Sequence, residues 1–257
     1  INGTTGYEEA AAQGLVAGAN AALSATGGEP FTLDRSTSYI GVLIDDLVNK
    51  PFDEPYRMLT SRAEHRLLLR TSTASDRLGE MAHEHGLIDA RRAAEIGADG
   101  AEIAKWTEQL NQMSIRPGSP FAAELEKISI RIPRETTAAE LARRPELGLR
   151  NLMAPLQLSQ LEGMRSDLVD RIEETIKYGD FILREAREVE RQAKLESKPI
   201  PTAIDYSDVA GLRFEAGQKL NRHRPATFGD ARRLSGVTPA DIAALLIHAT
   251  RAEAVRR

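Results

Sequence analysis

The amino-acid sequence predicts a mainly α-helical fold. Residues Tyr7–Leu23 form an alanine-rich run, and alanine has the highest intrinsic helix propensity. Between Ser166 and Leu195, apolar residues recur at spacings of three and four, the period at which side chains share one face of a helix. Thr137 is followed three residues later by Glu140, which is the capping-box pattern of a helix start.

The composition is that of a globular chain. With 257 residues, of which 41% are hydrophobic and 28% charged, the chain can bury a sizeable core. The sequence contains no uninterrupted run of about 18 apolar residues, so we expect no membrane span. It contains no cysteine, which excludes disulfides and thiolate metal sites within it.

A loop of small residues precedes the first predicted helix. The glycines in Asn2–Gly6 allow the backbone to turn tightly. A loop that leads into a helix presents N–H groups and the positive end of the helix dipole, which suits a phosphate or the negatively charged edge of a flavin. The alternative is an ordinary helix entry, with Gly14 and Gly18 spaced so that the helix packs closely on a sheet.

A second capping-box pattern, Ser61 with Glu64, predicts another helix start. In that helix Arg62, Arg66 and Arg70 would lie along one face at intervals of four, and the following leucines would supply the buried side. Ser61 is expected to act as the cap, since no base stands beside it. A further helix is expected over Asp76–Gly86 and a loop over Arg116–Pro120.

The long helix is predicted to end at the two prolines of Lys198–Pro201, because proline lacks the amide donor and restricts the residue before it. Two more helices are expected over Asp205–Leu220 and Thr238–Val255. The second would begin with Thr238 as N-cap and proline at its first position. Gly229 and Gly236 are expected to mark turns.

Charge is distributed unevenly along the chain, whose net charge is −4. Acidic residues dominate up to Tyr56, but Arg57, Arg62, Arg66 and Arg70 are then opposed only by Glu64. The tail from Arg213 onward is also rich in basic residues. Two local basic surfaces on an acidic protein favour selective contact with a polyanion. The alternative is that these charges only solvate helix faces.

The sequence predicts neither a catalytic constellation nor a metal site. The histidines show no metal-ligand spacing, and His83 and His85 would point to different faces of a helix. Asp45 and Asp46 are adjacent and would diverge on a helix, so they favour hydrogen bonding over a paired acid–base role. The Gly-rich dinucleotide-binding fingerprint is absent.

Three segments taken together, Ile1–Leu23, Tyr39–Val48 and Glu54–Arg70, resemble one known family. It is the FAD-dependent subunit of the bacterial tRNA wobble-uridine 5-carboxymethylaminomethyl-modifying enzyme, the glucose-inhibited division protein A family. Further matching segments follow in the same order, so the resemblance covers the whole chain: Lys177-Tyr178, Ile200-Pro201, Asp205-Tyr206, Gly211-Leu212, Arg224-Pro225 and Gly236–Ala240. The chain departs from the usual family residues at Pro51-Phe52, His65, Phe181 and Asp230.

The resemblance implies three regions. Residues 1–60 would be the end of an FAD-binding α/β domain, 61–198 a helical domain, and 199–257 a C-terminal helical bundle for tRNA or partner binding. FAD would be touched by six residues of the first loop and helix: Asn2, Gly3, Thr4, Thr5, Gly6 and Glu8. The residues implied to contact tRNA are all arginines: Arg57, Arg62, Arg66, Arg224, Arg232 and Arg233.

The resemblance also implies an activity for the full-length enzyme. With a partner GTPase, it would add a (carboxymethyl)aminomethyl group to C5 of the wobble uridine in the cytoplasm, acting as a homodimer that uses FAD, NADH and methylene-tetrahydrofolate. The chain by itself is expected to be inactive. One alternative is a non-catalytic module that binds tRNA and the GTPase. Another is a relative of the folate- and FAD-dependent tRNA uracil methyltransferase, which lacks the long helical tail.

Overall fold

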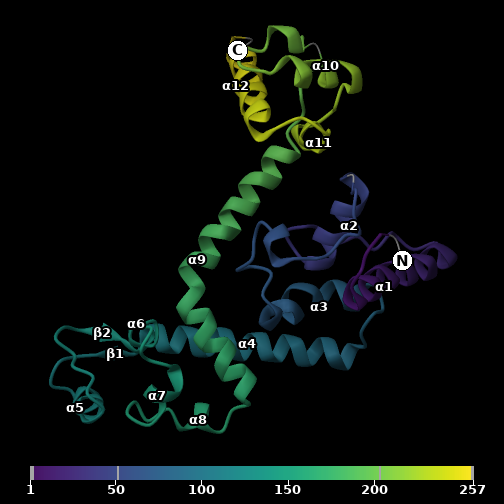
Figure 1. Cartoon of the computed structure of the whole chain (residues 1–257). Coiled ribbons are helices and arrows are strands. Elements are labelled where there is room, and N and C mark those ends of the chain that lie inside the picture. The colour runs from purple at the N-terminus through teal and green to yellow at the C-terminus, as the bar shows by residue number, and fades with distance from the viewer. Residues whose placement is uncertain (1–2, 51, 203, 256–257) are drawn as a thin grey trace. The chain divides into compact units, whose positions relative to one another are not determined.

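The computed structural model describes residues 3–50, 52–202 and 204–255, and these residues are mainly helical (Figure 1). Their contacts divide the chain into two compact units. Unit 1 comprises Ile1–Ile44 and Pro55–Glu185, and unit 2 comprises Asp45–Glu54 and Ala186–Arg257. The predicted boundaries after residues 60 and 198 stay a prediction.

Unit 1 begins with α1 (Tyr7–Thr26) and the first turns of α2 (Tyr39–Asn49). Two short 3-10 turns, η1 (Thr60–Arg62) and η2 (Thr71–Thr73), precede α3 (Ala74–Glu84) and α4 (Ala90–Gln112). The remaining elements of unit 1 follow in chain order: β1 (Ser114–Ile115), α5 (Pro120–Lys127), β2 (Thr136–Thr137), α6 (Ala138–Ala142), α7 (Leu149–Met153), α8 (Ser159–Glu162) and the first turns of α9 (Ser166–Glu196).

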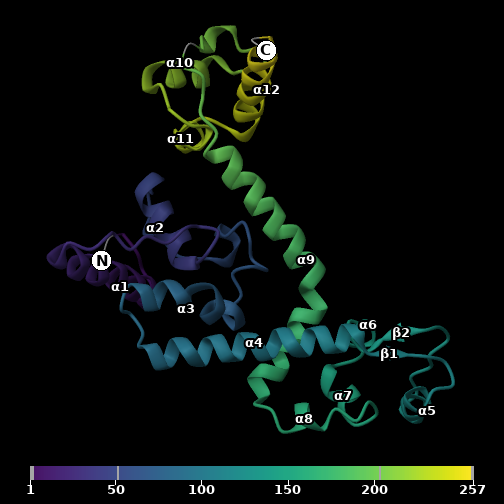
Figure 2. The ribbon, with the colours of Figure 1, turned by 180° about the vertical axis from the view of Figure 1, so that it is seen from behind.

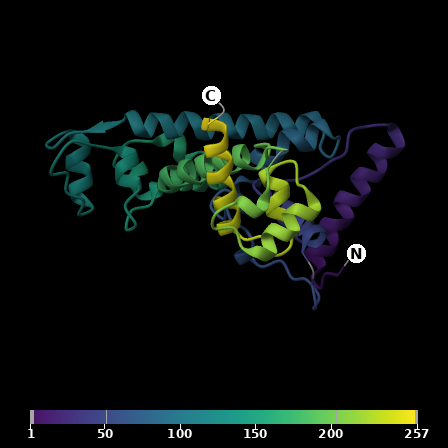
Figure 3. The ribbon, with the colours of Figure 1, turned by 90° about the horizontal axis from the view of Figure 1, so that it is seen from above.

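The main core of unit 1 lies where α9 crosses α4 and where the short helices α5–α8 pack beside them (Figure 2). Trp106 and Leu110 of α4 are buried there with Ile172 of α9. The strands β1 and β2 pair antiparallel, with Ser114 opposite Thr137, and lie at one end of α4 (Figure 3). The pairing of these short strands closes the loop that carries α5.

Unit 2 contains the ends of α2 and α9 and four further elements: η3 (Tyr206–Asp208), α10 (Phe214–His223), α11 (Phe228–Arg233) and α12 (Pro239–Val255). Its core is separate from that of unit 1 and includes Tyr206, Leu220, Phe228 and Leu245. None of the helices in the described part of the chain is long and apolar enough to cross a membrane.

The prediction of a mainly helical fold is confirmed, as are most of its helices. Helix α1 covers the alanine-rich run, and α9 covers the long periodic segment and ends before the prolines. The capping box of Thr137 and Glu140 is present at the start of α6. Thr238 caps α12, whose first residue is Pro239.

The predicted helix starting at Ser61 is wrong. The chain makes only the turn η1, and Ala63 is already extended with φ −86° and ψ 131°. Glu64 does not return to the Ser61 backbone because its carboxylate pairs with Arg35 at 2.8 Å. Tertiary contacts therefore override the local capping pattern. As a result, Arg62, Arg66 and Arg70 do not share a helix face.

One of the two turns predicted at glycines is wrong. Gly229 does not mark a turn but lies within α11, whereas Gly236 does adopt a left-handed turn conformation with φ +88°. Gly14 and Gly18 are exposed on α1, and no sheet packs against them within the described residues. The interpretation that their spacing lets α1 pack closely on a sheet stays a prediction.

Candidate functional site

The N-terminal loop is held against residues 55–58 by a parallel β-bridge between Thr4 and Tyr56. The Thr5 N–H donates to the Tyr56 carbonyl at 3.1 Å, and the Tyr56 N–H donates to the Gly3 carbonyl at 2.6 Å. Gly3 has φ +61°, a conformation that favours glycine. The bridge gives this loop a fixed place beside a segment more than fifty positions later in the chain, counted from Thr4 to Tyr56.

Glu9 occupies the positive end of α1. Its side chain is buried, and its Oε1 accepts a hydrogen bond from the Met58 N–H at 2.9 Å. This backbone hydrogen bond is the main cause that lowers the pKa of Glu9. A Cβ added at Gly6 would lie 1.6 Å from Oε2 of Glu9, so glycine leaves the room that the carboxylate fills. An incoming anion at this helix end would meet that negative charge.

The predicted FAD residues differ in exposure and in their contacts. The Thr4 hydroxyl accepts a hydrogen bond from Gln13 at 3.0 Å, while Thr5 and Glu8 are exposed. Asn2 lies outside the described residues. The sequence analysis named Glu8 as a cofactor contact and did not single out Glu9. The role of Glu9 depends on its hydrogen bond with Met58, a long-range contact that no local sequence pattern encodes.

The predicted tRNA arginines Arg57 and Arg62 lie next to the same loop. Arg57 is exposed, and its Nε donates a long hydrogen bond of 3.4 Å to Thr5 Oγ1. The Arg62 guanidinium lies 4.3 Å from the centre of the Tyr56 ring, a cation–π contact, and its Nε donates to the Arg57 carbonyl at 2.8 Å. Arg66 is exposed.

The N-terminal loop and the arginine loop (residues 56–66) therefore form one surface of unit 1. The bridge through Thr4 and Tyr56 joins the two segments, and Arg57 reaches across it to Thr5. Sequence reasoning predicted two separate sites in these segments, because it could not see that the two segments pair. Chemically, the surface combines backbone groups of a glycine loop with exposed guanidinium groups that suit phosphate.

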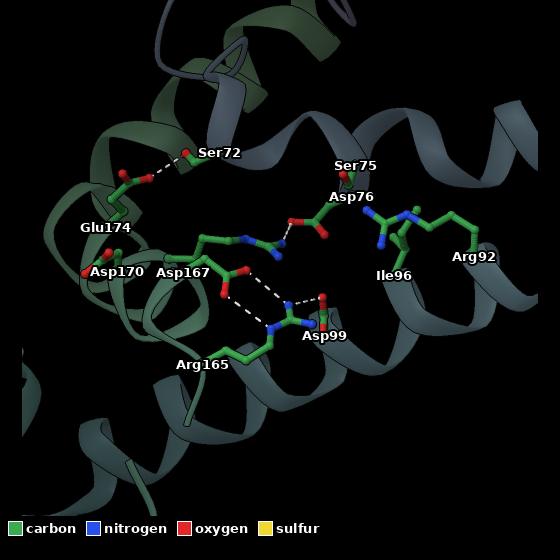
Figure 4. A pocket seen from close by; sticks show the side chains of 11 residues that line it. Ser72, Ser75, Asp76, Arg92, Ile96, Asp99, Arg165, Asp167, Asp170 and Glu174 are labelled. Carbon is green, nitrogen blue, oxygen red and sulfur yellow. Dashed lines mark hydrogen bonds and ion pairs between the residues drawn. The ribbon is translucent and has the colours of Figure 1, made fainter. Parts of the chain in front are cut away.

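Unit 1 also contains a cavity of about 620 Å³ between α3, α4 and the first turns of α9 (Figure 4). Arg165 donates to Asp99 at 2.6 Å and to Asp167, and Arg171 pairs across the cavity with Asp76. The lining holds five carboxylates but only three guanidinium groups. Because its cations are paired and its acids are in excess, the cavity does not suit a polyanion.

The predicted tRNA arginines of unit 2 make contacts within that unit. Arg224 donates to the Ile204 carbonyl at 2.9 Å and lies 5.5 Å from the centre of the Tyr206 ring. Arg232 pairs with Glu196 at 3.0 Å, and Arg233 pairs with Asp230 at 3.4 Å. All three remain exposed, and exposed ion pairs are weak enough for a phosphate to compete with them.

Asp45 and Asp46 form separate contacts on α2. Asp45 accepts from Asn49 at 2.9 Å, and the buried Asp46 pairs with Lys50 at 2.6 Å, in agreement with the hydrogen-bonding interpretation. Among residues 3–50, 52–202 and 204–255, no group of three or more metal-ligating side chains could hold a metal ion.

Three family models match separate parts of the chain, in chain order. Glucose inhibited division protein A matches residues 1–29, the tRNA modifying enzyme MnmG/GidA C-terminal helical domain matches 90–186, and the MnmG/GidA C-terminal helical bundle matches 188–257. The chain belongs to the MnmG/GidA family. The prediction of a C-terminal portion of this family is confirmed.

Relatives and solved structures agree with the MnmG/GidA assignment. The tRNA uridine 5-carboxymethylaminomethyl modification enzymes MnmG of Roseiflexus sp. (strain RS-1) and Lachnoclostridium phytofermentans are each 47% identical over 96% of this chain. The chain spans 36% and 39% of their respective lengths. Two crystal structures of Aquifex aeolicus GidA, forms II and I, are each 38% identical to this chain in sequence, and they match its fold with TM-scores of 0.71 and 0.68. They match 97% and 96% of this chain, and 39% and 38% of their own.

Proposed function

We propose that this chain supplies the tRNA-contacting surface, and one edge of the flavin site, of an enzyme that adds a (carboxymethyl)aminomethyl group to C5 of the tRNA wobble uridine. The observation that carries the proposal is the pairing of the N-terminal loop with the arginine loop. A base-modifying enzyme must hold RNA phosphates close to its cofactor so that an exposed base can reach the reacting atoms. The paired loops offer both contacts within one surface.

FAD fits this surface only in part. Gly3 has no atom within 4 Å of an added Cβ, so a ligand can approach its backbone closely. Glu9 disfavours a phosphate directly at the start of α1, so the backbone of Gly3–Gly6 is better suited to a hydrogen-bonding edge of the cofactor. FAD would supply the redox chemistry when bound, and this chain's own residues would orient it.

The co-substrates, the partner and the location in this proposal rest on membership of the MnmG/GidA family. The proposal includes NADH and methylene-tetrahydrofolate as co-substrates, a partner GTPase, a homodimer and a cytoplasmic location. The MnmG names of the relatives favour this activity over that of the uracil methyltransferase. The non-catalytic alternative, a module that binds tRNA and the GTPase, is favoured by the exposed Arg232 and Arg233 of unit 2.

Replacing Arg57 and Arg66 together by alanine is expected to weaken tRNA binding. Both side chains are exposed, so folding should change little. Binding releases about one counterion for each phosphate that an arginine neutralises. The variant lacks two such contacts, so the steepness of the plot of log affinity against log salt should fall by ~2. Filter binding of a tRNA transcript at several salt concentrations measures this slope.

The matched control for the arginine variant is Arg150→Ala, which removes an exposed arginine that pairs with Asp170 at 2.6 Å, away from the paired loops. Its salt slope should equal that of the wild-type chain. An unchanged slope for the Arg57 and Arg66 variant would remove these arginines from the tRNA surface.

The chain by itself is expected not to retain FAD. The paired loops provide one edge of a site, but the sequence lacks the Gly-rich fingerprint that binds the pyrophosphate of a dinucleotide. The visible absorption spectrum after incubation with FAD and gel filtration measures retention. Stoichiometric flavin on this chain would contradict the view that its flavin site is incomplete.

A further inference from the structure

One face of α9 carries polar side chains that contact the segment 68–76. Within that face, Glu174, Tyr178 and Glu185 follow Arg171 at helical spacings. The Leu68 N–H donates to Glu185 Oε2 at 3.0 Å. The Ser72 hydroxyl donates to Glu174 Oε2 at 2.6 Å (Figure 4). Arg171 pairs with Asp76. The segment is therefore fastened to α9 at three points along its length.

Of the three contacts, that of Glu174 matters most, because Glu174 also pairs with Arg70. The Arg70 side chain is only 16% exposed and forms an ion pair with Glu174 at 3.5 Å. Its Nε and Nη1 are buried and have no hydrogen-bond partner among the described residues, and its guanidinium lies 5.5 Å from the centre of the Tyr178 ring. A buried guanidinium with so few partners depends on the nearby carboxylate to offset its charge.

A second cation increases this dependence. Arg77 Nη2 donates to the Arg70 carbonyl at 3.0 Å. Burial, followed by the positive charge of Arg70, lowers the pKa of Arg77. Asp76 is already paired with Arg171. The charge of Glu174 therefore stabilises a locally cationic segment.

The segment 68–76 continues directly from the arginine loop. The Leu69 N–H donates to the His65 carbonyl at 3.1 Å, and Leu69 is buried in a small core with Val42 and Ala63. The Arg62 carbonyl accepts from Arg35 at 3.3 Å. If Leu69 moved, the arginine loop would move with it, because Leu69 packs on Ala63 and bonds to His65 within that loop.

We propose that Glu174 is a positioning residue, which fixes the arginine loop for RNA by anchoring Arg70 and Ser72 to α9. This inference rests on the proposed function, because it concerns the same tRNA surface. Glu174 is an anion and would repel a phosphate, so its role is to hold Arg70 and Ser72 and not to bind RNA. It sets the geometry of Arg57, Arg62 and Arg66 from the other end of the segment.

The direction of the effect of Glu174→Gln on tRNA affinity tests the proposal. Removing a negative charge near an RNA-binding surface should strengthen binding if charge alone matters. If Glu174 positions the loop, Glu174→Gln should instead weaken binding of an unmodified tRNA transcript by about threefold to tenfold, the range expected from one or two lost polar contacts. The matched control Asp170→Asn removes the same charge one turn earlier on α9, where the carboxylate pairs with Arg150.

Hydrogen exchange of the 257-residue chain provides an independent readout. Glu174→Gln and Ser72→Ala should both speed exchange in residues 65–76, while Asp170→Asn should not. Glu174→Asp, which keeps the charge, should restore part of the tRNA affinity. Binding by Glu174→Gln that is as tight as that of Asp170→Asn, or unchanged exchange in residues 65–76, overturns the positioning role.

The two proposals fail in different ways. If the Arg57 and Arg66 variant loses tRNA affinity but Glu174→Gln does not, the tRNA surface stands and the positioning role is wrong. If the arginine variant keeps its affinity and salt slope, the proposed tRNA surface is wrong, and with it the role of Glu174 in RNA binding. Ser72→Ala removes only the hydroxyl by which the partly buried Ser72 of η2 donates to Glu174, so it tests the anchor even if Glu174→Gln folds poorly.

Discussion

We expect Gly41→Ala to destabilise unit 1 strongly, although it adds only one methyl group. Gly41 is buried in α2, and a Cβ at this position would lie 2.1 Å from the carbonyl oxygen of Asp34 and 2.7 Å from that of Leu33. These are backbone atoms, which cannot rotate away as a side chain can. Overpacking of this kind costs about 3 kcal/mol, and chemical denaturation measures it as a lower midpoint.

Gly97→Ala in α4 is the matched control, because it is the same substitution within a helix. A Cβ at Gly97 would meet no atom within 4 Å. Alanine has the higher helix propensity, so this variant should be as stable as the wild-type chain or more stable by up to ~1 kcal/mol. Equal midpoints for Gly41→Ala and the wild type would show that α2 does not pack closely against residues 33–34.

The helices that could be predicted from the sequence are those whose signals are local. The alanine content of α1, the apolar period of α9 and the capping box of Thr137 each act within a few turns of the chain. The pattern at Ser61 is equally local, but the Arg35–Glu64 pair forms across 29 positions and overrides it. Sequence periodicity contains no information about such a partner.

The candidate site was predictable only in its parts. Resemblance selected the glycine loop and the arginines, and Arg57 does lie beside Thr5. The joining of these parts depends on the parallel bridge at Tyr56 and on the buried carboxylate of Glu9. Both connect residues about fifty positions apart. A single sequence shows the residue types that such contacts need, but not which residues meet.

In unit 2, Asp241 holds the start of α12 to the start of α10. Its carboxylate is 1% exposed and accepts hydrogen bonds from Arg213 Nη2 at 2.6 Å and from the Thr238 N–H at 2.7 Å. The Thr238 hydroxyl at 2.6 Å, and Nε and the backbone N–H of Arg213, also donate to it. The hydrogen bonds from Arg213 are the largest cause that holds the pKa of Asp241 far below its ordinary value. One buried carboxylate therefore caps a helix and anchors an arginine of another element.

Asp241→Asn should lower the stability of unit 2 and remove part of its acid sensitivity. An amide cannot accept from all of these donors, and losing a charged acceptor at a buried position costs about 2–3 kcal/mol. The pKa of Asp241 is lower in the folded than in the unfolded chain, so its contribution is complete above the unfolded pKa of about 4 and is lost as the pH falls through the folded pKa.

Thermal denaturation between pH 7 and pH 2 measures both effects of Asp241→Asn. The wild-type chain should lose stability below about pH 4 more steeply than the variant, because only the wild type must protonate this carboxylate. Asp208→Asn is the matched control, since Asp208 is exposed in the same unit. It should leave the stability at neutral pH near that of the wild type. If Asp241→Asn and Asp208→Asn gave the same melting temperature at pH 7, Asp241 would not hold α12 to α10.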